Sequence, residues 1–270
     1  MVVTAARDIE GATAAAQCVV RTHERLVEFL RAGQTLAQVD RFVAETLADL
    51  DCKSAFLRYK IPGHPPFPSH SCLSVNECIV HGTHLMSDHP LEAGDLFSID
   101  IGVNHQGWIG DAAWTYAIEA ADETALKLME SGRESLRRGI EAMQPGKPLS
   151  DWARAVQHCV EKEYGFLLVR GLGGHGYGRK LHGPPFISNV LPRYPGEWPD
   201  ASKKFEPGML IAVEPMIAVS TASITSNSRE WPIFTADGSI SVHYEADVLI
   251  TEDGPRDLTE GMADLPDIVG

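Results

Sequence analysis

The stretch Glu92-Ala-Gly-Asp-Leu-Phe-Ser-Ile-Asp100 has a second, altered copy, Glu206-Pro-Gly-Met-Leu-Ile-Ala-Val-Glu214. Each copy is an apolar run that ends in a carboxylate. A buried carboxylate without a partner is strongly unfavourable, so each one must meet a cation or hold a proton. The repeat therefore predicts two matched strands that bring acidic groups to one site.

The duplication extends to a helical segment upstream of each strand. Residues 32–43 align with residues 145–156 at an offset of 113, against 114 for the strand phrase. Two copies without a short period indicate internal pseudo-symmetry and not a solenoid. Chance similarity of amphipathic helices explains the helical part alone, but less readily a helix and a strand repeated in the same order. We predict one catalytic domain over 1–270, built from halves at about 9–120 and 121–252.

The amino-acid composition excludes several classes of protein. The net charge is -14, which disfavours nonspecific nucleic-acid binding because that needs basic surface. The five cysteines form no CxxC pair, so neither a disulfide framework nor a thiolate zinc site is indicated, and a reducing compartment is expected. No run of about 18 apolar residues occurs. We expect a cytoplasmic protein with no membrane and no nucleic-acid partner.

Hydrophobic periodicity predicts helices and strands in alternating groups. Thr35 and Gln38 have the spacing of a capping box, and Gly33 can close the helix before them. The predicted helices are 9–30, 35–50, 123–143 and 150–163; the predicted strands are 72–80, 96–103, 108–118, 209–219, 231–234 and 239–251. Helices followed by strands, twice, predict an α+β fold with helices covering a curved, mainly antiparallel sheet.

The first half contains a predicted hairpin that brings two aspartates together. If residues 104–107 form a four-residue loop, Asp100 lies directly opposite Asp111 on the same face. Such a pair is destabilising unless a cation bridges it or the two acids share one proton. We favour the metal, because Asp100 lies between Ile99 and Ile101. An exposed strand end remains a reasonable interpretation for Asp111 alone.

The second half offers matching carboxylates. Glu214 ends the repeated phrase, and Pro215 biases it to an extended conformation. Glu245 lies in the alternating segment 239–250. There the polar residues could simply form the wet face of a strand, and only the symmetry with the first hairpin favours Glu245 as a site residue.

A glycine-rich segment and two histidines complete the set. Residues 171–176 formally match GxGxxG, but the later Gly178, Pro184 and Pro185 prevent the helix that a dinucleotide site needs. The glycines more plausibly let the backbone pack closely around His175, which is then free to be a ligand. His81 and His182 are each followed by glycine and precede a repeated phrase, which suggests a pair flanking one cleft. Four carboxylates and one imidazole suit divalent first-row metals, and two such ions indicate metal-assisted hydrolysis.

The order Asp100, Asp111, His175, Glu214, Glu245 resembles that of the type I methionine aminopeptidases, in the pita-bread metallopeptidase family. The likeness covers nearly the whole chain. Further matches are the segments 74–82, 174–178, 214–215 and 244–245.

The resemblance implies two divalent metals (Co, Mn, Fe or Zn), with Asp111 and Glu245 bridging them, Asp100 on one, and His175 with Glu214 on the other. It further implies that a bridging hydroxide attacks the first peptide bond while Glu214 accepts a proton. His182 would stabilise the tetrahedral intermediate and His81 would contact the scissile amide. The implied methionine pocket is lined by Phe67, Cys72, Leu181 and Trp231.

The implied activity is removal of the initiator methionine from nascent chains with a small second residue, by a monomer with possible ribosome contact. Two alternatives stay open: a related hydrolase of X-Pro or other small amide substrates, and a pita-bread binding protein without catalysis. The chain departs from the family pattern at positions that tune metal affinity and rate. These positions are Ala112, Gly183, Pro184, His243, Ala246 and Asp247.

Overall fold

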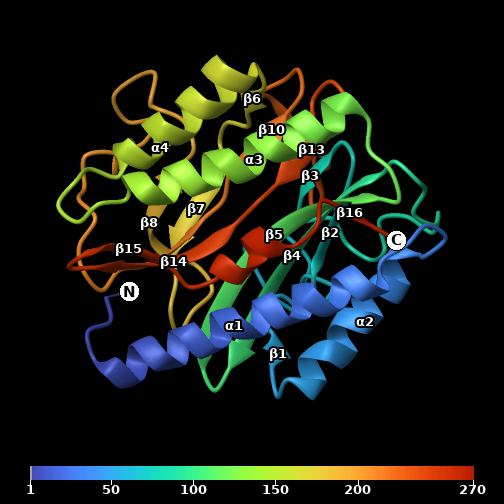
Figure 1. The fold of residues 1–270 in the computed structure, drawn as a ribbon, viewed down its shortest axis with the longest axis horizontal. Helices are drawn as coiled ribbons and strands as arrows, with labels where there is room; N and C mark the ends of the chain where they lie inside the picture. Colours follow the sequence, from blue (N-terminus) through green and yellow to red (C-terminus); the bar gives the residue numbers. More distant parts are fainter. Residues whose placement is uncertain (1) are drawn as a thin grey trace.

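The computed structural model describes residues 2–270, and Figure 1 shows the order of their elements. The α-helices are α1 (Ala6–Phe29), α2 (Leu36–Asp49), α3 (Glu123–Ala142) and α4 (Ser150–Gln157). A π-helical turn, His158–Tyr164, continues α4, and a 3-10 turn spans Glu260–Asp264. The capping box at Thr35 is present, with Gln38 donating to the Thr35 side chain and accepting from its backbone. None of the described helices is long and apolar enough to cross a membrane.

The described strands form two five-stranded and two three-stranded sheets. The first large sheet holds β1 (Lys53–Ser54), β2 (Cys72–Val75), β4 (Leu96–His105), β5 (Trp108–Ile118) and β16 (Ile268–Val269). The second holds β7 (Gly173–Gly176), β8 (Gly183–Ser188), β9 (Leu210–Val213), β14 (Ala246–Thr251) and β15 (Gly254–Asp257). One small sheet holds β6 (Leu167–Leu168), β10 (Met216–Ala218) and β13 (Ser241–His243). The other holds β3 (Cys78–Val80), β11 (Ile224–Ser226) and β12 (Ile233–Thr235).

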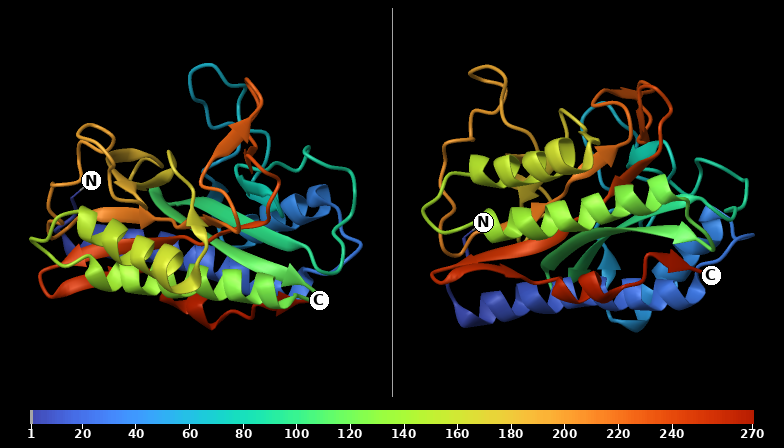
Figure 2. Two further views of the ribbon diagram at one scale, coloured as in Figure 1. Left: turned by 90° about the horizontal axis from the view of Figure 1, so that it is seen from above. Right: turned by 45° about the horizontal axis from the view of Figure 1, so that its top comes forward.

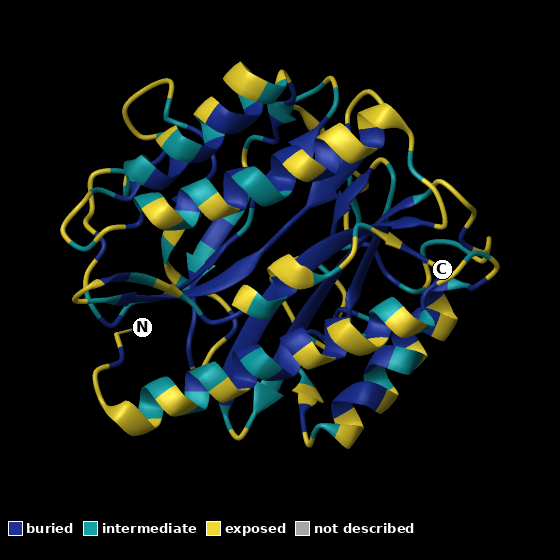
Figure 3. Ribbon diagram, viewed as in Figure 1, coloured by how far each residue is buried: buried dark blue, intermediate teal, exposed yellow. Residues whose placement is uncertain are grey.

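Helices cover one side of this strand layer. In the left view of Figure 2, α3 and α4 lie below the strands, whereas the loops near residues 60–70 and 220–235 rise on the other side. Helix α1 packs against β4 and β5 so closely that a Cβ on Gly110 would lie 2.6 Å from the Ala15 backbone. Figure 3 shows buried strands between helices whose outer faces are exposed. The α+β prediction is confirmed, whereas the division into two pseudo-symmetric halves stays a prediction.

Several predicted elements differ in detail from those observed. Helix α1 ends at Phe29, and Gly33 instead lies in the following turn with φ +86°. The predicted strand 209–219 is interrupted at Glu214-Pro215, since proline has no N–H to donate to a ladder. The predicted strand 239–251 is also two strands, and Glu245 lies in the break. Both interruptions fall at predicted site residues.

The predicted register of the β4–β5 hairpin is wrong by two residues. The turn is only Gln106-Gly107, both with positive φ, so His105 pairs with Trp108 and not Val103. This is the conformation of a two-residue type I′ hairpin, whose twist matches the strands. Asp100 therefore lies opposite Ala113, and Asp111 opposite Gly102. A shift of two keeps both carboxylates on one face, as diagonal and not direct neighbours.

Candidate metal centre

One pocket of about 190 Å³ is lined by every side chain that the sequence predicts for the site. It joins residues that lie far apart in the chain and on both large sheets. The predicted residues that line it are Phe67, Cys72, His81, Asp100, Asp111, His175, Leu181, His182, Glu214, Trp231 and Glu245. Phe56, Tyr59 and Ile61, which the sequence did not single out, complete the wall.

Backbone pairing places the carboxylates around one point. Asp100 on β4 lies opposite Ala113 on β5, and the Ala113 carbonyl accepts a 2.9 Å hydrogen bond from the Glu245 N–H. Glu245 thus lies beside the aspartate hairpin although it precedes β14 of the other sheet. Glu214 follows β9, which pairs with β14 through Val213 and Ala246. The contact between β5 and β14 therefore brings Glu214 and Glu245 close to the two aspartates of the β4–β5 hairpin.

His175 reaches the same point from β7. It lies opposite Ala212 on β9, two residues before Glu214. Its Nε2 is 3.6 Å from Asp111 Oδ2 and 4.0 Å from Glu214 Oε1. Burial lowers the pKa of His175 to about 3, which keeps the imidazole neutral, as a metal ligand must be.

The glycines around His175 have the predicted role. A Cβ on Gly174 would lie 2.2 Å from the Ala212 carbonyl oxygen, and one on Gly176 would lie 2.2 Å from that of Pro184. The segment forms strand β7, and the next element is strand β8 and not a helix. The segment therefore lacks the helix that a dinucleotide site needs.

The acidic groups are buried without enough partners. Oδ1 of Asp100 and Oδ1 of Asp111 are both buried with no hydrogen-bond partner. Burial raises the pKa of Asp100 to about 7 and that of Glu214 to about 8. It also raises the pKa of Asp111 and Glu245 well above the usual range, and neighbouring carboxylates add to both shifts. A divalent cation would satisfy these oxygens, so the residues fit a metal centre.

Two groups of ligand atoms around the acidic residues have the spacing for a metal ion. Asp111, His175 and Glu245 form one, and Glu214, His243 and Glu245 form the other, with ligand atoms in each group within 4.8 Å. Glu245 belongs to both. The geometry thus accommodates metal on two sides of Glu245.

The segment around Glu245 is not a wet strand face. His243, Glu245 and Asp247 are all buried: β13 packs between helix α3 and the β4–β5 hairpin, and β14 packs against β5. Asp247 Oδ2 accepts a 2.9 Å hydrogen bond from the Asp111 N–H. His243 Nε2 has no hydrogen-bond partner and is 3.4 Å from Glu214 Oε2. Two positions that depart from the family pattern therefore contact the acidic set.

The two cleft histidines lie on opposite flanks of the pocket. His182 Nδ1 is 2.7 Å from the Tyr59 hydroxyl, and its ring centroid is 4.4 Å from that of His175. His81 has φ +59°, and its ring is T-shaped against Trp231. Burial lowers the pKa of His81 to about 4. The sequence offered no signal for Tyr59, which lies in a proline-rich loop.

The far end of the pocket is apolar. Phe67 and Trp231 pack edge to face with centroids 5.2 Å apart, and the Trp231 indole N–H donates to the Pro65 carbonyl. Cys72 lies opposite Asp100 across β2 and β4, so it stands where the apolar end meets the acidic end. Such a cavity suits an apolar side chain with a polar group at its base.

A larger hollow of about 690 Å³ lies beside α3 and touches Glu245. Its arginines are already paired with carboxylates. Glu134 binds both Arg137 and Arg138, and Arg133 binds Asp267. It lacks the aspartates and histidines that converge in the smaller pocket.

Comparison with known proteins identifies the family. The model of metallopeptidase family M24 matches residues 10–252. A methionine aminopeptidase of Aquifex aeolicus is 34% identical over 258 residues, which cover 94% of this chain and 96% of the relative. The crystal structure of a methionine aminopeptidase from Thermotoga maritima is 33% identical with a TM-score of 0.85, covering 96% of this chain and 99% of that one.

The wider fold is shared with longer enzymes. Prolidase from Pyrococcus furiosus has a TM-score of 0.71 at 22% identity, and the match covers 96% of this chain but 65% of that chain. That likeness shows the fold alone, and it agrees with the predicted pita-bread fold. The chain belongs to metallopeptidase family M24 and, within it, to the methionine aminopeptidases.

Proposed function

We propose that this chain removes the N-terminal methionine from nascent proteins whose second residue is small, as a cytoplasmic enzyme. The observation that carries the proposal is one pocket with buried carboxylates and His175 at its base and an apolar end at Phe67 and Trp231. Membership of a metallopeptidase family implies the use of divalent metal. A flexible thioether side chain suits the apolar end.

Two divalent ions fit the ligand set, as Co, Mn, Fe or Zn. Asp100, Asp111, His175, Glu214 and Glu245 would hold the ions, with Asp111 and Glu245 placed centrally among the ligands. The ions would activate a water molecule and polarise the scissile carbonyl. The orphaned oxygens of Asp100 and Asp111 support this assignment.

The remaining residues would orient the substrate and move protons. Glu214 is partly accessible from the pocket, which suits a group that accepts a proton. His182, held by the Tyr59 hydroxyl, would stabilise the negative charge that develops on the carbonyl oxygen. His81 would contact the scissile amide from the Trp231 side.

The test is hydrolysis of Met-Ala-Ser against Leu-Ala-Ser and Ala-Pro peptides, with and without a chelator. We expect chelator-sensitive release of methionine to dominate, because the apolar end selects the first side chain. No chelator-sensitive release of methionine would contradict the proposal. Faster release from Ala-Pro would favour the alternative of an X-Pro hydrolase, and binding without turnover would favour the inactive binding protein.

Trp231→Ala is expected to reduce the preference for Met-Ala-Ser over Leu-Ala-Ser about tenfold, since apolar pockets discriminate by about 1–3 kcal/mol. The loss should fall mainly on KM, because the indole packs on Phe67 and lies away from the carboxylates. Steady-state kinetics on both peptides measures it. Trp198→Ala is the control: Trp198 is equally buried but outside the pocket, so its Met/Leu ratio should not change.

A further inference from the structure

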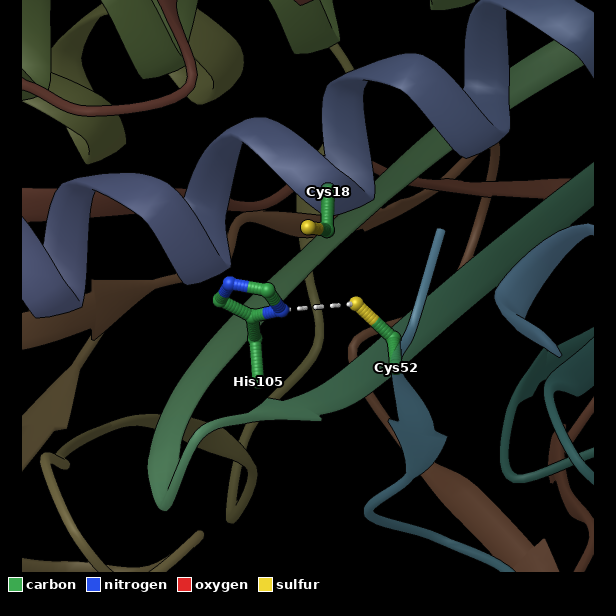
Figure 4. A group of neighbouring side chains, drawn as sticks. All are labelled: Cys18, Cys52 and His105. Atoms are coloured by element: carbon green, nitrogen blue, oxygen red, sulfur yellow. Dashed lines mark hydrogen bonds between the residues drawn. The ribbon is translucent and has the colours of Figure 1, made fainter. Parts of the chain in front are cut away.

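Three side chains outside the pocket converge near the turn of the β4–β5 hairpin (Figure 4). Cys18 comes from α1, Cys52 immediately precedes β1, and His105 ends β4. One ligand atom from each lies within 4.8 Å of the others, and Cys52 Sγ is 3.5 Å from His105 Nδ1. None of the three lines the acidic pocket. The three positions share no local sequence motif, so the sequence alone does not indicate a thiolate site.

The fold holds this cluster firmly in place. Lys53 pairs with Asn104 in the β1–β4 ladder, and continuing that antiparallel register by one residue sets Cys52 opposite His105. Helix α1 packs across β4 and β5 and turns Cys18 toward the same point. Cys18 and Cys52 are 5% and 7% exposed, whereas His105 is partly exposed. The two sulfurs are therefore positioned by backbone contacts and shielded from solvent.

The geometry matches a tetrahedral thiolate and imidazole site. Sulfur at about 2.3 Å and nitrogen at about 2.0–2.1 Å from a tetrahedral ion lie about 3.6 Å apart. The observed separation of Cys52 and His105 is 3.5 Å. The same separation also allows an S–H···N hydrogen bond, so the discriminating feature is the second sulfur, from Cys18. A hydrogen bond needs only two partners, whereas this cluster brings three potential metal-ligand atoms close together.

In the metal-free protein the surroundings favour one thiolate beside one thiol, because the contact between the two sulfurs lowers the pKa of Cys18 and raises that of Cys52. The Cys52 thiol beside Cys18 lowers the pKa of Cys18 to about 6, and His105 and Arg21 add to the shift. Thiolate is the form of cysteine that binds metal. Two sulfurs and one nitrogen are a soft ligand set, unlike the oxygen-rich acidic pocket.

We propose that Cys18, Cys52 and His105 bind one thiophilic divalent cation of the Zn²⁺ and Cd²⁺ class, with the fourth position open to water beside His105. The site is separate from the acidic centre, and the proposal does not rest on the proposed function. A bound ion would join the N-terminal helix and the edge strand β1 to the hairpin that carries Asp111. Its effect would therefore be on the stability of that hairpin, not on the reaction.

The test is titration of the reduced, metal-free full chain with Cd²⁺, read as thiolate-to-cadmium charge-transfer absorption in the ultraviolet. We expect one equivalent to produce the band in the wild type and in Asp111→Asn, which disables the acidic centre. Cys18→Ser and Cys52→Ser should each lose most of the band. Cys72→Ser and Cys159→Ser should keep it, because those buried thiols lie elsewhere. His105→Ala should keep a band and bind Cd²⁺ more weakly.

Several results would overturn the proposal. They are the absence of a band in the folded wild type, a band that Cys72→Ser abolishes, and undiminished affinity in His105→Ala. Formation of a Cys18–Cys52 disulfide with diamide in a protein that takes up no Cd²⁺ would instead identify the pair as a redox couple. The wild-type titration alone can reject the proposed site. The proposal therefore stays testable even if a serine variant misfolds. Failure here would leave methionine release by the acidic pocket unaffected.

Discussion

Asp111→Asn is expected to lower kcat/KM for Met-Ala-Ser by about a thousandfold or more, the scale of losing a central catalytic group. Asp111 contributes to the ligand cluster with His175 and Glu245, and its Oδ1 is buried without a partner. A neutral amide would replace one anionic oxygen by an N–H₂ donor, which repels a cation. The variant should also hold less divalent metal, which elemental analysis of the dialysed protein measures.

The control for this variant is Asp253→Asn, which makes the same chemical change on an exposed turn. It should keep both activity and metal content. Circular dichroism separates loss of the site from loss of the fold, and we expect Asp111→Asn to stay folded because it removes repulsion among buried carboxylates. An Asp111→Asn protein with near wild-type turnover would show that the pocket is not the active site.

Some of the candidate metal ligands stand out in the sequence because their signals are local. Asp100 and Glu214 each end an apolar run, and that pattern alone indicates burial of a charged group. The hairpin register was missed because it depends on a left-handed Gln106, which nothing in Asn104-His-Gln-Gly107 specifies. The error moved Asp111 by two positions and so left it on the correct face.

The contacts between the halves could not be predicted from sequence. His243 and Asp247 alternate with apolar residues, as they would on a solvated strand, and they are buried by the packing of β13 and β14 on the β4–β5 hairpin. The hydrogen bonds from Glu245 to Ala113 and from Asp111 to Asp247 connect residues more than a hundred positions apart. The cluster of Cys18, Cys52 and His105 was missed for the same reason. The hydrophobic pattern of a segment indicates which face of its helix or strand is apolar. It does not indicate which other segment packs against that face.

Removal of metal is expected to make the stability of this protein fall as pH rises from 6.5 to 8. Without metal, burial raises the pKa of Asp100 to about 7 and of Glu214 to about 8, far above their values in an unfolded chain. The folded state therefore binds protons that the unfolded state has already released. A carboxyl group with a raised folded pKa stabilises the protein below its unfolded pKa, and this contribution is lost as pH rises through the folded pKa.

In the window of pH 6.5 to 8 one other group, Cys18, acts in the opposite direction, because its pKa is lowered to about 6 and its thiolate stabilises the fold as pH rises. The measurement is therefore made on Cys18→Ser protein. The buried histidines 81, 175 and 243 have lowered pKa values and so destabilise the fold only below about pH 6.5, the value of a free imidazole. The two carboxyl groups together should cost about 2–3 kcal/mol of unfolding free energy across the window. Urea unfolding of chelator-treated protein at pH 6.5 and 8 measures it.

Metal-loaded protein is the first comparison and should not show this fall, because the cation replaces the protons and its affinity increases with pH. Glu214→Gln is the second. Glutamine stays neutral at every pH, so the metal-free variant should lose the part of the slope that Glu214 contributes and keep the part from Asp100. A metal-free Cys18→Ser protein that is equally stable or more stable at pH 8 would mean that these carboxylates are already ionised in the fold. In that case their buried oxygens would need a partner other than the metal, and the reason for placing the ions among them would be lost.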